Sequence, residues 1–240
     1  RNSGIWRKIR MTKKLIIGAT LVVALVVLGV GQSKIQEPSI AASNDVMAPH
    51  FLVDPFWPKP LPNHWAMGNT IGVDVDERDH IFIVHRNDAS QFGGNTEIGL
   101  QGGVAECCTP APPIIEIDIE GNIINAWGGP VEGAPYDWPA SNHGIEIAPN
   151  GDVWIGGNGG GDSHVLVFTR DGEYIRTIGM QGEDRNSNSE THFGRVAEIA
   201  IDVEANEAYF ADGYQNRRVA VVDVATGAFK RYWGAYGNRP

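Results

Sequence analysis

Three polar side chains occupy similar places in three related stretches of this sequence. Arg86 closes the stretch IFIVHR, His143 precedes GIEIA, and Tyr214 follows EAYFAD. A neutral imidazole can bind zinc, a guanidinium can hold a carboxylate through two hydrogen bonds, and a tyrosine beside cations can accept a proton. These residue types could therefore carry out metal-assisted proton transfer. The structural alternative is that His143 caps a strand, Tyr214 packs on a rim and Arg86 pairs with Asp88.

The elements that must position these residues recur along the chain. Three segments, GNIINAWGG, GEYIRTIGM and GAFKRYWGA, begin at Gly121, Gly172 and Gly227, which are 51 and 55 residues apart. Each is preceded by a matching pair of alternating stretches, and in the second unit the four strands are expected at about 144–148, 152–157, 164–169 and 173–178. Short antiparallel sheets recurring at this interval are typical of β-propeller blades. The sequence predicts an all-β propeller of four-stranded, NHL-type blades at about 71–129, 143–180 and 196–236.

Three blades are too few to close a propeller, which has about four to eight. We expect the chain to be half of a six-bladed protein. The alternative is a ring completed by a second copy, which would give a compact dimer. The first unit carries an insertion at 88–113, and insertions in propellers lie over one face.

The topology of such a blade places the polar residues. An antiparallel pair brings the start of its first strand and the end of its second strand to the same edge. Arg86, His143 and Tyr214 should therefore emerge on one face, near the central channel. His192 could reach that face, although a loop role is favoured for it.

Other polar features receive simpler interpretations. His50, His64, His80 and His164 have no evident partners in the sequence. The glycine-rich run from Gly156 to Asp162 is interpreted as a flexible connection, because no helix follows it to form a phosphate site.

The composition and the N-terminal region limit where the protein is located and what it binds. A net charge of -10 and a pI near 5.1 argue against a nucleic-acid surface. An apolar run from Leu15 to Gly31 follows Lys13 and Lys14, which is typical of an export signal, with a retained membrane anchor as the alternative. We therefore expect a leader at 1–33, a linker and entry segment at 34–65 and a partial propeller at 66–240, in an exported protein. Any membrane contact would come through an uncleaved leader.

The two cysteines, Cys107 and Cys108, are adjacent in the insertion. Their Cα atoms must be about 3.8 Å apart, which is short for an ordinary disulfide. A strained disulfide, a metal site with soft ligands, and pairing with partners outside this sequence all remain open.

The sequence resembles the peptidyl-α-hydroxyglycine α-amidating lyases (peptidylamidoglycolate lyases), over residues 71–236. The resemblance lies in HRND at 85–88, NHGIEIAPNGDVWI at 142–155, and THF with DGYQNRR between 191 and 218. It implies a six-bladed NHL-type propeller that uses zinc to cleave peptidyl-α-hydroxyglycine into a peptide amide and glyoxylate.

The same resemblance implies roles for individual residues. His143 would bind zinc, Arg86 would hold substrate, and Tyr214 would be the catalytic base. The backbone carbonyls of Val73 and Ile145 would bind a structural calcium. Two further zinc histidines would lie beyond Pro240. Gly194 and Gln215 stand where the family has a disulfide.

Two functional hypotheses follow. The first is a zinc-dependent lyase of the amidating type or a related metalloenzyme. The second is a non-catalytic scaffold that binds a peptide, glycan or small molecule on the same face. A lactonase-like metal hydrolase is a third, but the sequence lacks the acidic ligands that it needs.

Overall fold

The computed structural model describes Val23, Val26 and residues 51–87, 107–184 and 186–234. The chain forms two units, residues 1–53 and 54–240. In the first, Val23 and Val26 are helical and exposed. No helix among the described residues is both long and apolar enough to cross a membrane, and most of the run from Leu15 to Gly31 lies outside them.

The described regular elements of the second unit are all strands. They are β1 Trp65–Ala66, β2 Asn69–Val75, β3 Ile81–Arg86, β4 Thr109–Pro110, β5 Ile114–Ile117, β6 Ile123–Trp127, β7 Asn142–Ile147, β8 Val153–Gly157, β9 His164–Phe168, β10 Tyr174–Gly179, β11 Val196–Asp202, β12 Glu207–Asp212, β13 Arg218–Asp223 and β14 Phe229–Gly234.

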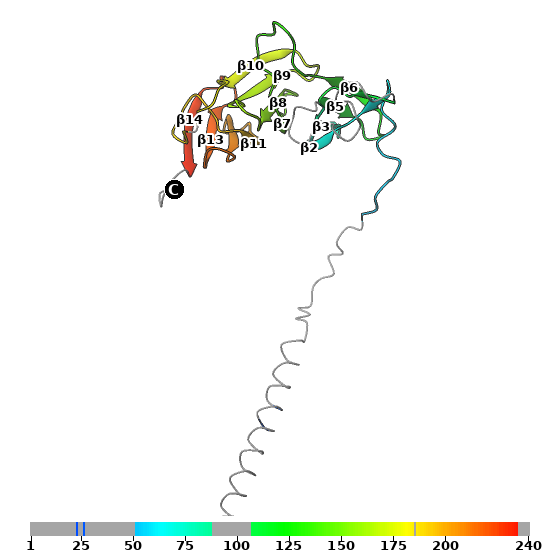
Figure 1. Ribbon diagram of the computed structural model, residues 1–240. Helices are drawn as coiled ribbons and strands as arrows, with labels where there is room; N and C mark the ends of the chain where they lie inside the picture. The colour runs from blue at the N-terminus through cyan, green and yellow to red at the C-terminus, as the bar shows by residue number, and fades with distance from the viewer. Residues whose placement is uncertain (1–22, 24–25, 27–50, 88–106, 185, 235–240) are drawn as a thin grey trace, which may run out of the picture. The chain divides into compact units, whose positions relative to one another are not determined.

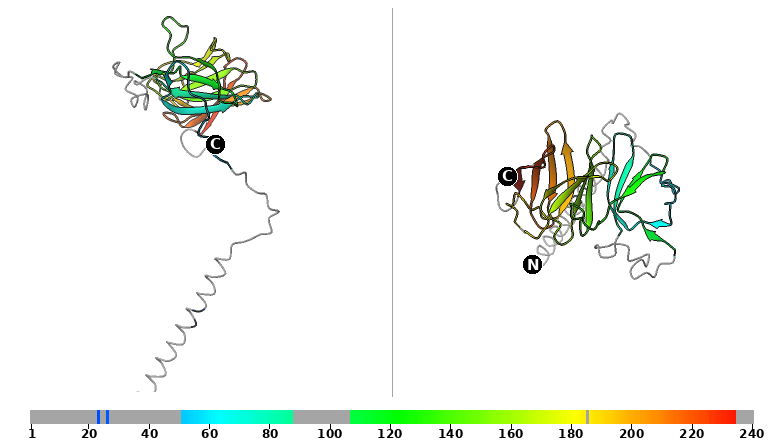
Figure 2. Two further views of the ribbon diagram at one scale, coloured as in Figure 1. Left: turned by 90° about the vertical axis from the view of Figure 1, so that its right-hand side faces the viewer. Right: turned by 90° about the horizontal axis from the view of Figure 1, so that it is seen from above.

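Twelve of these strands form three four-stranded antiparallel sheets. The first sheet has the order β2-β3-β5-β6, the second β7-β8-β9-β10, and the third β11-β12-β13-β14. They fan out side by side in Figure 1, and the view from above in Figure 2 shows the same succession. Their first strands, β2, β7 and β11, pack against one another in that order. The predicted all-β propeller fold with four-stranded blades is confirmed.

The core lies between the sheets. One cluster joins the first and second sheets through Phe82, Val84, Ile155 and Phe168, and another joins the second and third through residues such as Trp154 and Phe210. Fully burying each of these large side chains contributes about 1.5–3 kcal/mol. The middle strands β3, β5, β8 and β9 are buried on both faces because each has a sheet or the entry segment on either side. Their continuous apolar character follows from that position.

The described part of the entry segment, before the first sheet, is packed against that sheet. Trp57 Nε1 donates a hydrogen bond to the Ile119 carbonyl (3.1 Å), and Lys59 N donates to the Gly121 carbonyl (3.0 Å). Leu61 and Trp65 cover Ile83, Ile115 and Ile117. Within the predicted insertion, β4 pairs in parallel with β1. Residues 88–106 of that insertion lie outside the described residues.

Carboxylates of the first strands link neighbouring sheets. Asp74 Oδ2 in β2 accepts a hydrogen bond from Ile147 N in β7 (2.5 Å), and Glu146 Oε1 in β7 accepts one from Ile201 N in β11 (3.0 Å). Both carboxylates occupy the same repeat position, and each bonds to the next position of the following sheet. Burial, followed by the nearby negative charge of Asp74, raises the pKa of Glu146 to about 7. Ionisation of Glu146 therefore destabilises the folded chain.

We expect Glu146→Gln to stabilise the protein at alkaline pH. The raised pKa means that the folded chain binds this proton more tightly than the unfolded chain, so wild-type stability falls as pH rises from about 4.5 to 7. The glutamine keeps the bond from Ile201 N and removes the charge. Its advantage should be absent near pH 4 and reach about 2 kcal/mol near pH 8, after allowance for partial solvation.

Urea unfolding across this pH range would measure the effect. Glu120→Gln, which makes the same substitution at an exposed carboxyl, is the matched control. If Glu146→Gln raises the free energy of unfolding by the same amount at pH 4 and at pH 8, the raised pKa of Glu146 is not the cause.

Candidate functional site

Arg86 lies at the end of β3 and spans the boundary between the first and second sheets. Its side chain is buried, with 6% of the residue exposed. Nε donates to the Asn142 carbonyl (3.3 Å), and Nη2 donates to Asn158 Oδ1 (3.0 Å). Burial lowers the pKa of Arg86, while attraction to the nearby phenol of Tyr214 acts in the opposite direction. The guanidinium is therefore fixed in place and within electrostatic reach of Tyr214.

His85, the neighbour of Arg86, has a structural role. It is fully buried; its Nδ1 accepts a hydrogen bond from Gly68 N (3.1 Å), so Nε2 carries the proton and donates to the Pro112 carbonyl (2.8 Å). Burial lowers the pKa of His85, which favours this neutral ring. The ring joins the segment before β2 to the segment before β5.

His143 lies within β7, one residue after its start, and not before the strand as the sequence suggested. The β7–β8 register shifts between Asn142 and Ile145, and β2 and β11 shift at the corresponding place. Such bulges re-aim side chains, and in β7 the bulge contains His143. Its Nδ1 donates to the Ala197 carbonyl of β11 (2.7 Å). In the neutral ring, Nε2 is therefore left as an acceptor.

Tyr214 follows β12 by two residues and completes the group. Its hydroxyl lies 2.8 Å from His143 Nε2, and the two rings meet edge to face with centroids 5.2 Å apart. Because His143 Nδ1 carries the proton, the phenol is the donor in this bond. Tyr214 is 55% exposed, so the phenol faces solvent while its partner is anchored. The structure thus brings Arg86, His143 and Tyr214 together from three sheets.

The positions expected to bind calcium lie on adjacent first strands. Val73 is opposite Ile83 in the first sheet, and Ile145 is opposite Ile155 in the second. The strands approach closely, because a Cβ on Gly72 would come within 2.9 Å of the His143 carbonyl oxygen. The calcium site stays a prediction.

A zinc ion would find one fitting ligand here. A histidine whose Nδ1 donates to a backbone carbonyl has the usual form of a zinc ligand, and a zinc ion on Nε2 would replace the hydrogen bond that this nitrogen accepts from Tyr214. Across the parts of the chain that the structure describes, however, no group of three or more His, Cys, Asp or Glu side chains could hold a metal ion. His143 fits zinc, but these residues do not by themselves complete a zinc site, which needs about three protein ligands.

Two histidine interpretations change with the structure, and that of His192 does not. His164 is buried at the start of β9 and Nε2 donates to the Asp137 carbonyl (2.8 Å), and His80 Nδ1 lies 2.7 Å from Glu116 Oε1, so both have partners that the sequence did not reveal. His192 contacts Thr191 through Nδ1 (3.1 Å), and among the described residues no contact joins it to the His143–Tyr214 pair.

The glycine-rich connection at 156–162 is also held more firmly than expected. Asp162, 1% exposed, accepts hydrogen bonds from the backbone N–H groups of Ala140, Ser141 and Gly159. This carboxylate fixes both the glycine-rich loop and the segment that leads into β7. The Asp at the end of the glycine run could have indicated a fixed loop from the sequence, because a short acidic side chain commonly accepts hydrogen bonds from nearby backbone N–H groups.

The segment that carries Tyr214 rests on a second buried anchor. Asp212 accepts from Gly194 N and from Asn216 Nδ2 (2.9 Å), and pairs with Arg218 Nε (2.7 Å). Gln215 N donates to the Gly194 carbonyl (2.9 Å), so a backbone hydrogen bond joins the two positions where the resemblance implied a missing disulfide.

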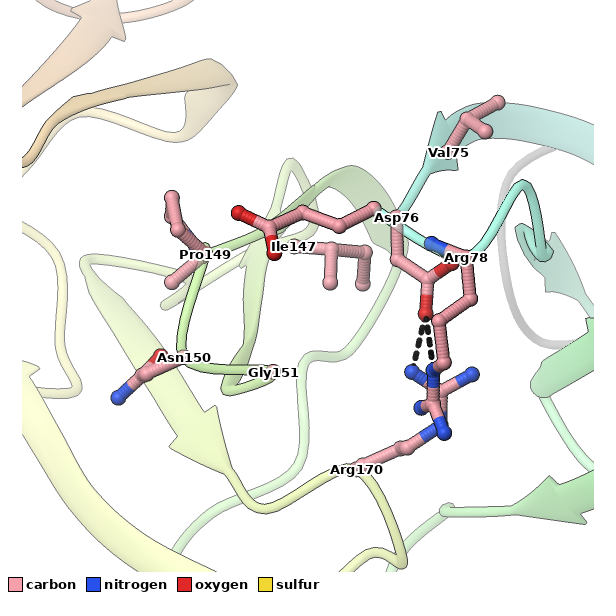
Figure 3. Close-up of a pocket in the computed structure, with 10 residues that line it drawn as sticks. Val75, Asp76, Arg78, Ile147, Pro149, Asn150, Gly151 and Arg170 are labelled. Atoms are coloured by element: carbon pink, nitrogen blue, oxygen red, sulfur yellow. Dashed lines mark hydrogen bonds and ion pairs between the residues drawn. The ribbon is translucent and has the colours of Figure 1, made fainter.

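A separate pocket of about 380 Å³ lies where the β2–β3 and β7–β8 turns meet, at the other end of the strands. Figure 3 shows Asp76 facing both Arg78 and Arg170 there. Arg170 also pairs with the buried Glu116. Its guanidinium lies over the ring of Phe82, with Cζ 4.9 Å from the ring centroid. These charges satisfy one another, so this pocket is a junction between the first two sheets.

Cys107 and Cys108 form a disulfide with each other, with Cα atoms 3.8 Å apart. Of the three alternatives left open by the sequence, the structure contains the first. Neither thiol is free.

Comparison with known proteins is informative at this point. The chain is 25% identical over 165 residues to "Probable peptidyl-alpha-hydroxyglycine alpha-amidating lyase pgal-1" of Caenorhabditis elegans. The match covers 66% of this chain and 42% of that protein, so the chain spans about two fifths of the relative's length. This chain is similar to an amidating lyase. No protein-family model matches the sequence.

Solved structures with a similar arrangement are more distant in sequence. The structure of U3-55K is 14% identical with a TM-score of 0.45, covering 72% of this chain and 41% of that one. A catalytically inactive virginiamycin B lyase from Staphylococcus aureus, solved with quinupristin, is 16% identical with a TM-score of 0.42, covering 75% and 45%.

Proposed function

We propose that this protein contributes one part of an amidating-lyase-type active site, on an exported NHL-type propeller of six blades. The observation that carries the proposal is the contact between the Tyr214 hydroxyl and His143 Nε2, 2.8 Å apart, with Arg86 in electrostatic reach. The similarity to an amidating lyase over 165 residues supports the same chemistry. The additional zinc ligands and the remaining blades would have to come from outside the described residues.

In this proposal, the substrate is a peptide ending in α-hydroxyglycine. Tyr214, as the phenolate, accepts the proton of the substrate hydroxyl, the C–N bond breaks, and the same proton passes to the departing amide nitrogen, which restores the phenolate. The products are a peptide amide and glyoxylate, so atoms and charge balance without an oxidant. Arg86 holds the substrate carboxylate. Zinc, with His143 as one ligand, would polarise the hydroxyl, and calcium at Val73 and Ile145 would have a structural role.

The test is glyoxylate release from a peptidyl-α-hydroxyglycine by the full-length protein, together with its zinc content. Loss of a positioned proton acceptor typically costs at least 100-fold, so Tyr214→Phe should lower the rate by about 100-fold or more. Tyr174→Phe removes a phenol that contacts Thr177, away from the site, and should leave the rate within about twofold. Equal rates in wild type and Tyr214→Phe would exclude this role.

A binding scaffold without catalysis is the second candidate. The observation in its favour is that the described residues do not make a complete metal group. Full-length protein that binds no zinc and releases no glyoxylate, yet retains a ligand on this face, would support the scaffold and reject the lyase.

A further inference from the structure

A pocket of about 470 Å³ lies beside the phenol of Tyr214 and is lined in part by Ser141, Asn158, Gly160 and Arg195. Its volume is within the range of small-molecule sites. It is formed by the segment before β7, the glycine-rich loop and the segment before β11. None of its lining residues is acidic.

Arg195 gives this pocket a positive charge that the described residues do not neutralise. Arg78, Arg170, Arg218 and Arg231 each pair with a carboxylate, whereas Arg195 makes no ion pair with any described residue. With the Gln215 amide turned so that its oxygen faces Arg195, which is the orientation that satisfies both groups, Nε and Nη2 donate to that oxygen at 3.0 and 2.9 Å. The outer edge of the guanidinium, with Nη1 and the second Nη2 proton, is left for a ligand. That edge can grip a carboxylate with two parallel hydrogen bonds.

The backbone of Arg195 is held in an uncommon conformation. Its φ is 68°, in the left-handed region that residues with a side chain rarely adopt. The neighbouring Gly194 is locked from both sides, because its carbonyl accepts from Gln215 N and its N–H donates to Asp212. The fold thus maintains strain at the residue that carries the pocket's charge, a pattern common at ligand sites.

Ser141 supplies an independent sign of a ligand. The residue is 3% exposed and lines the pocket, and among the described residues its Oγ has no hydrogen-bond partner. A buried hydroxyl without a partner costs about 1–3 kcal/mol, so such groups usually meet a water or a ligand. The Oγ itself is buried, so a rotation of the side chain that turns the hydroxyl toward the pocket would let it donate to a negatively charged oxygen there.

Two carboxylates lie near the pocket, and neither neutralises Arg195. Asp162 lies under the glycine-rich loop and receives three backbone N–H groups. Glu183 Oε1 lies beside Gly160, 3.6 Å from where a Cβ on that glycine would be. Neither pairs with Arg195.

From these observations we infer that this pocket binds the carboxylate of a small organic anion, gripped by Arg195 and hydrogen-bonded by Ser141. Asn158, which also bonds Arg86, connects this subsite to the Arg86–His143–Tyr214 group. The inference needs neither zinc nor turnover, so it can hold or fail independently of the lyase chemistry.

Benzoylglycine and its neutral amide, benzoylglycinamide, are matched probes, because they differ in charge at one end. Binding to the full chain can be followed by calorimetry or ligand-observed NMR. A charge-assisted pair of bonds should make benzoylglycine bind at least about tenfold more tightly than the amide. Equal binding of the two, or no binding of either, would overturn the inference. So would inorganic phosphate that binds more tightly than benzoylglycine.

Variants locate the binding. Arg195→Gln should bring the affinities for benzoylglycine and benzoylglycinamide to within about twofold of each other. Ser141→Ala should weaken the binding of benzoylglycine by about two- to fivefold and leave the binding of the amide unchanged. Arg78→Gln removes the same charge at the distant pocket and should change nothing. If Arg195→Gln keeps the full preference, the anion binds elsewhere and the inference fails. Should Arg195→Gln not fold, the two probes and Ser141→Ala still decide the question.

Discussion

Replacing Arg218 with methionine should destabilise the protein by about 3–5 kcal/mol. Arg218 and Asp212 form an ion pair in which both side chains have no exposed surface. The methionine would leave the Asp212 carboxylate buried without its cation, and breaking one partner of a buried pair usually has this cost. Since a domain is stable by about 5–15 kcal/mol, such a loss would approach unfolding.

The effect should extend to the functional segment. Arg218 also donates to the carbonyls of Ser187 (2.9 Å), Ser189 (2.5 Å) and His192 (3.0 Å), which lie in the connection leading to Arg195. Losing these bonds would loosen both that connection and the turn that carries Tyr214. Protease sensitivity in residues 187–195 should therefore rise along with the loss of stability.

Urea unfolding monitored by tryptophan fluorescence would measure the change. Arg231→Met is the matched control, because Arg231 pairs with Glu207 at the surface, with half of its side chain exposed, and its loss should be much smaller. If the two variants unfold at the same urea concentration, the anchoring role of Arg218 is wrong.

Arg170→Met should have the second largest effect, about 2–4 kcal/mol. Arg170 reaches from the second sheet to Asp76 and Glu116 of the first, and the side chain of Glu116 is 2% exposed. Burial raises the pKa of Glu116, while the hydrogen bond and charge of His80 lower it in part. Without the guanidinium, little would offset the free-energy cost of burying an ionised Glu116.

This variant should have a distinct pH dependence. A raised folded-state pKa means that the folded chain binds the Glu116 proton more tightly, so stability falls as pH rises. Removal of Arg170 should steepen this fall, and the difference from wild type should be larger near pH 8 than near pH 5. Adding Glu116→Gln to the variant should restore part of the stability at the higher pH.

Arg78→Met provides the comparison within the same pocket. Arg78 pairs with the same Asp76, but 58% of its side chain is exposed, so its loss should cost under about 1 kcal/mol. A pH-independent cost for Arg170→Met, or equal costs for the two arginines, would show that the junction does not depend on the buried carboxylate.

The arrangement of strands was accessible from the sequence because it depends on local patterns. Turn glycines and alternating apolar stretches recur with the repeat, and the observed β7 to β10 differ from the expected strands by at most two residues at either end. The shared edge for Arg86, His143 and Tyr214 also followed, since antiparallel pairing alone puts the start of a blade's first strand beside the end of its second strand.

The details of the site depended on contacts between sheets. The bond between Tyr214 and His143 joins residues 71 positions apart, and the strand bulge that aims His143 has no signal in a run such as NHGIEI. The Arg170 junction spans 94 positions to Asp76, and its partners could not be paired from composition. The unpartnered hydroxyl of Ser141 and the unpaired charge of Arg195 become visible only when their surroundings are known. The sequence by itself determined the repeating strands and the edge where the polar residues emerge, because these depend on neighbours along the chain. Which of those residues touch, and which are left for a ligand, was decided by the tertiary structure, because hydrogen bonds require sub-ångström placement of groups from different sheets.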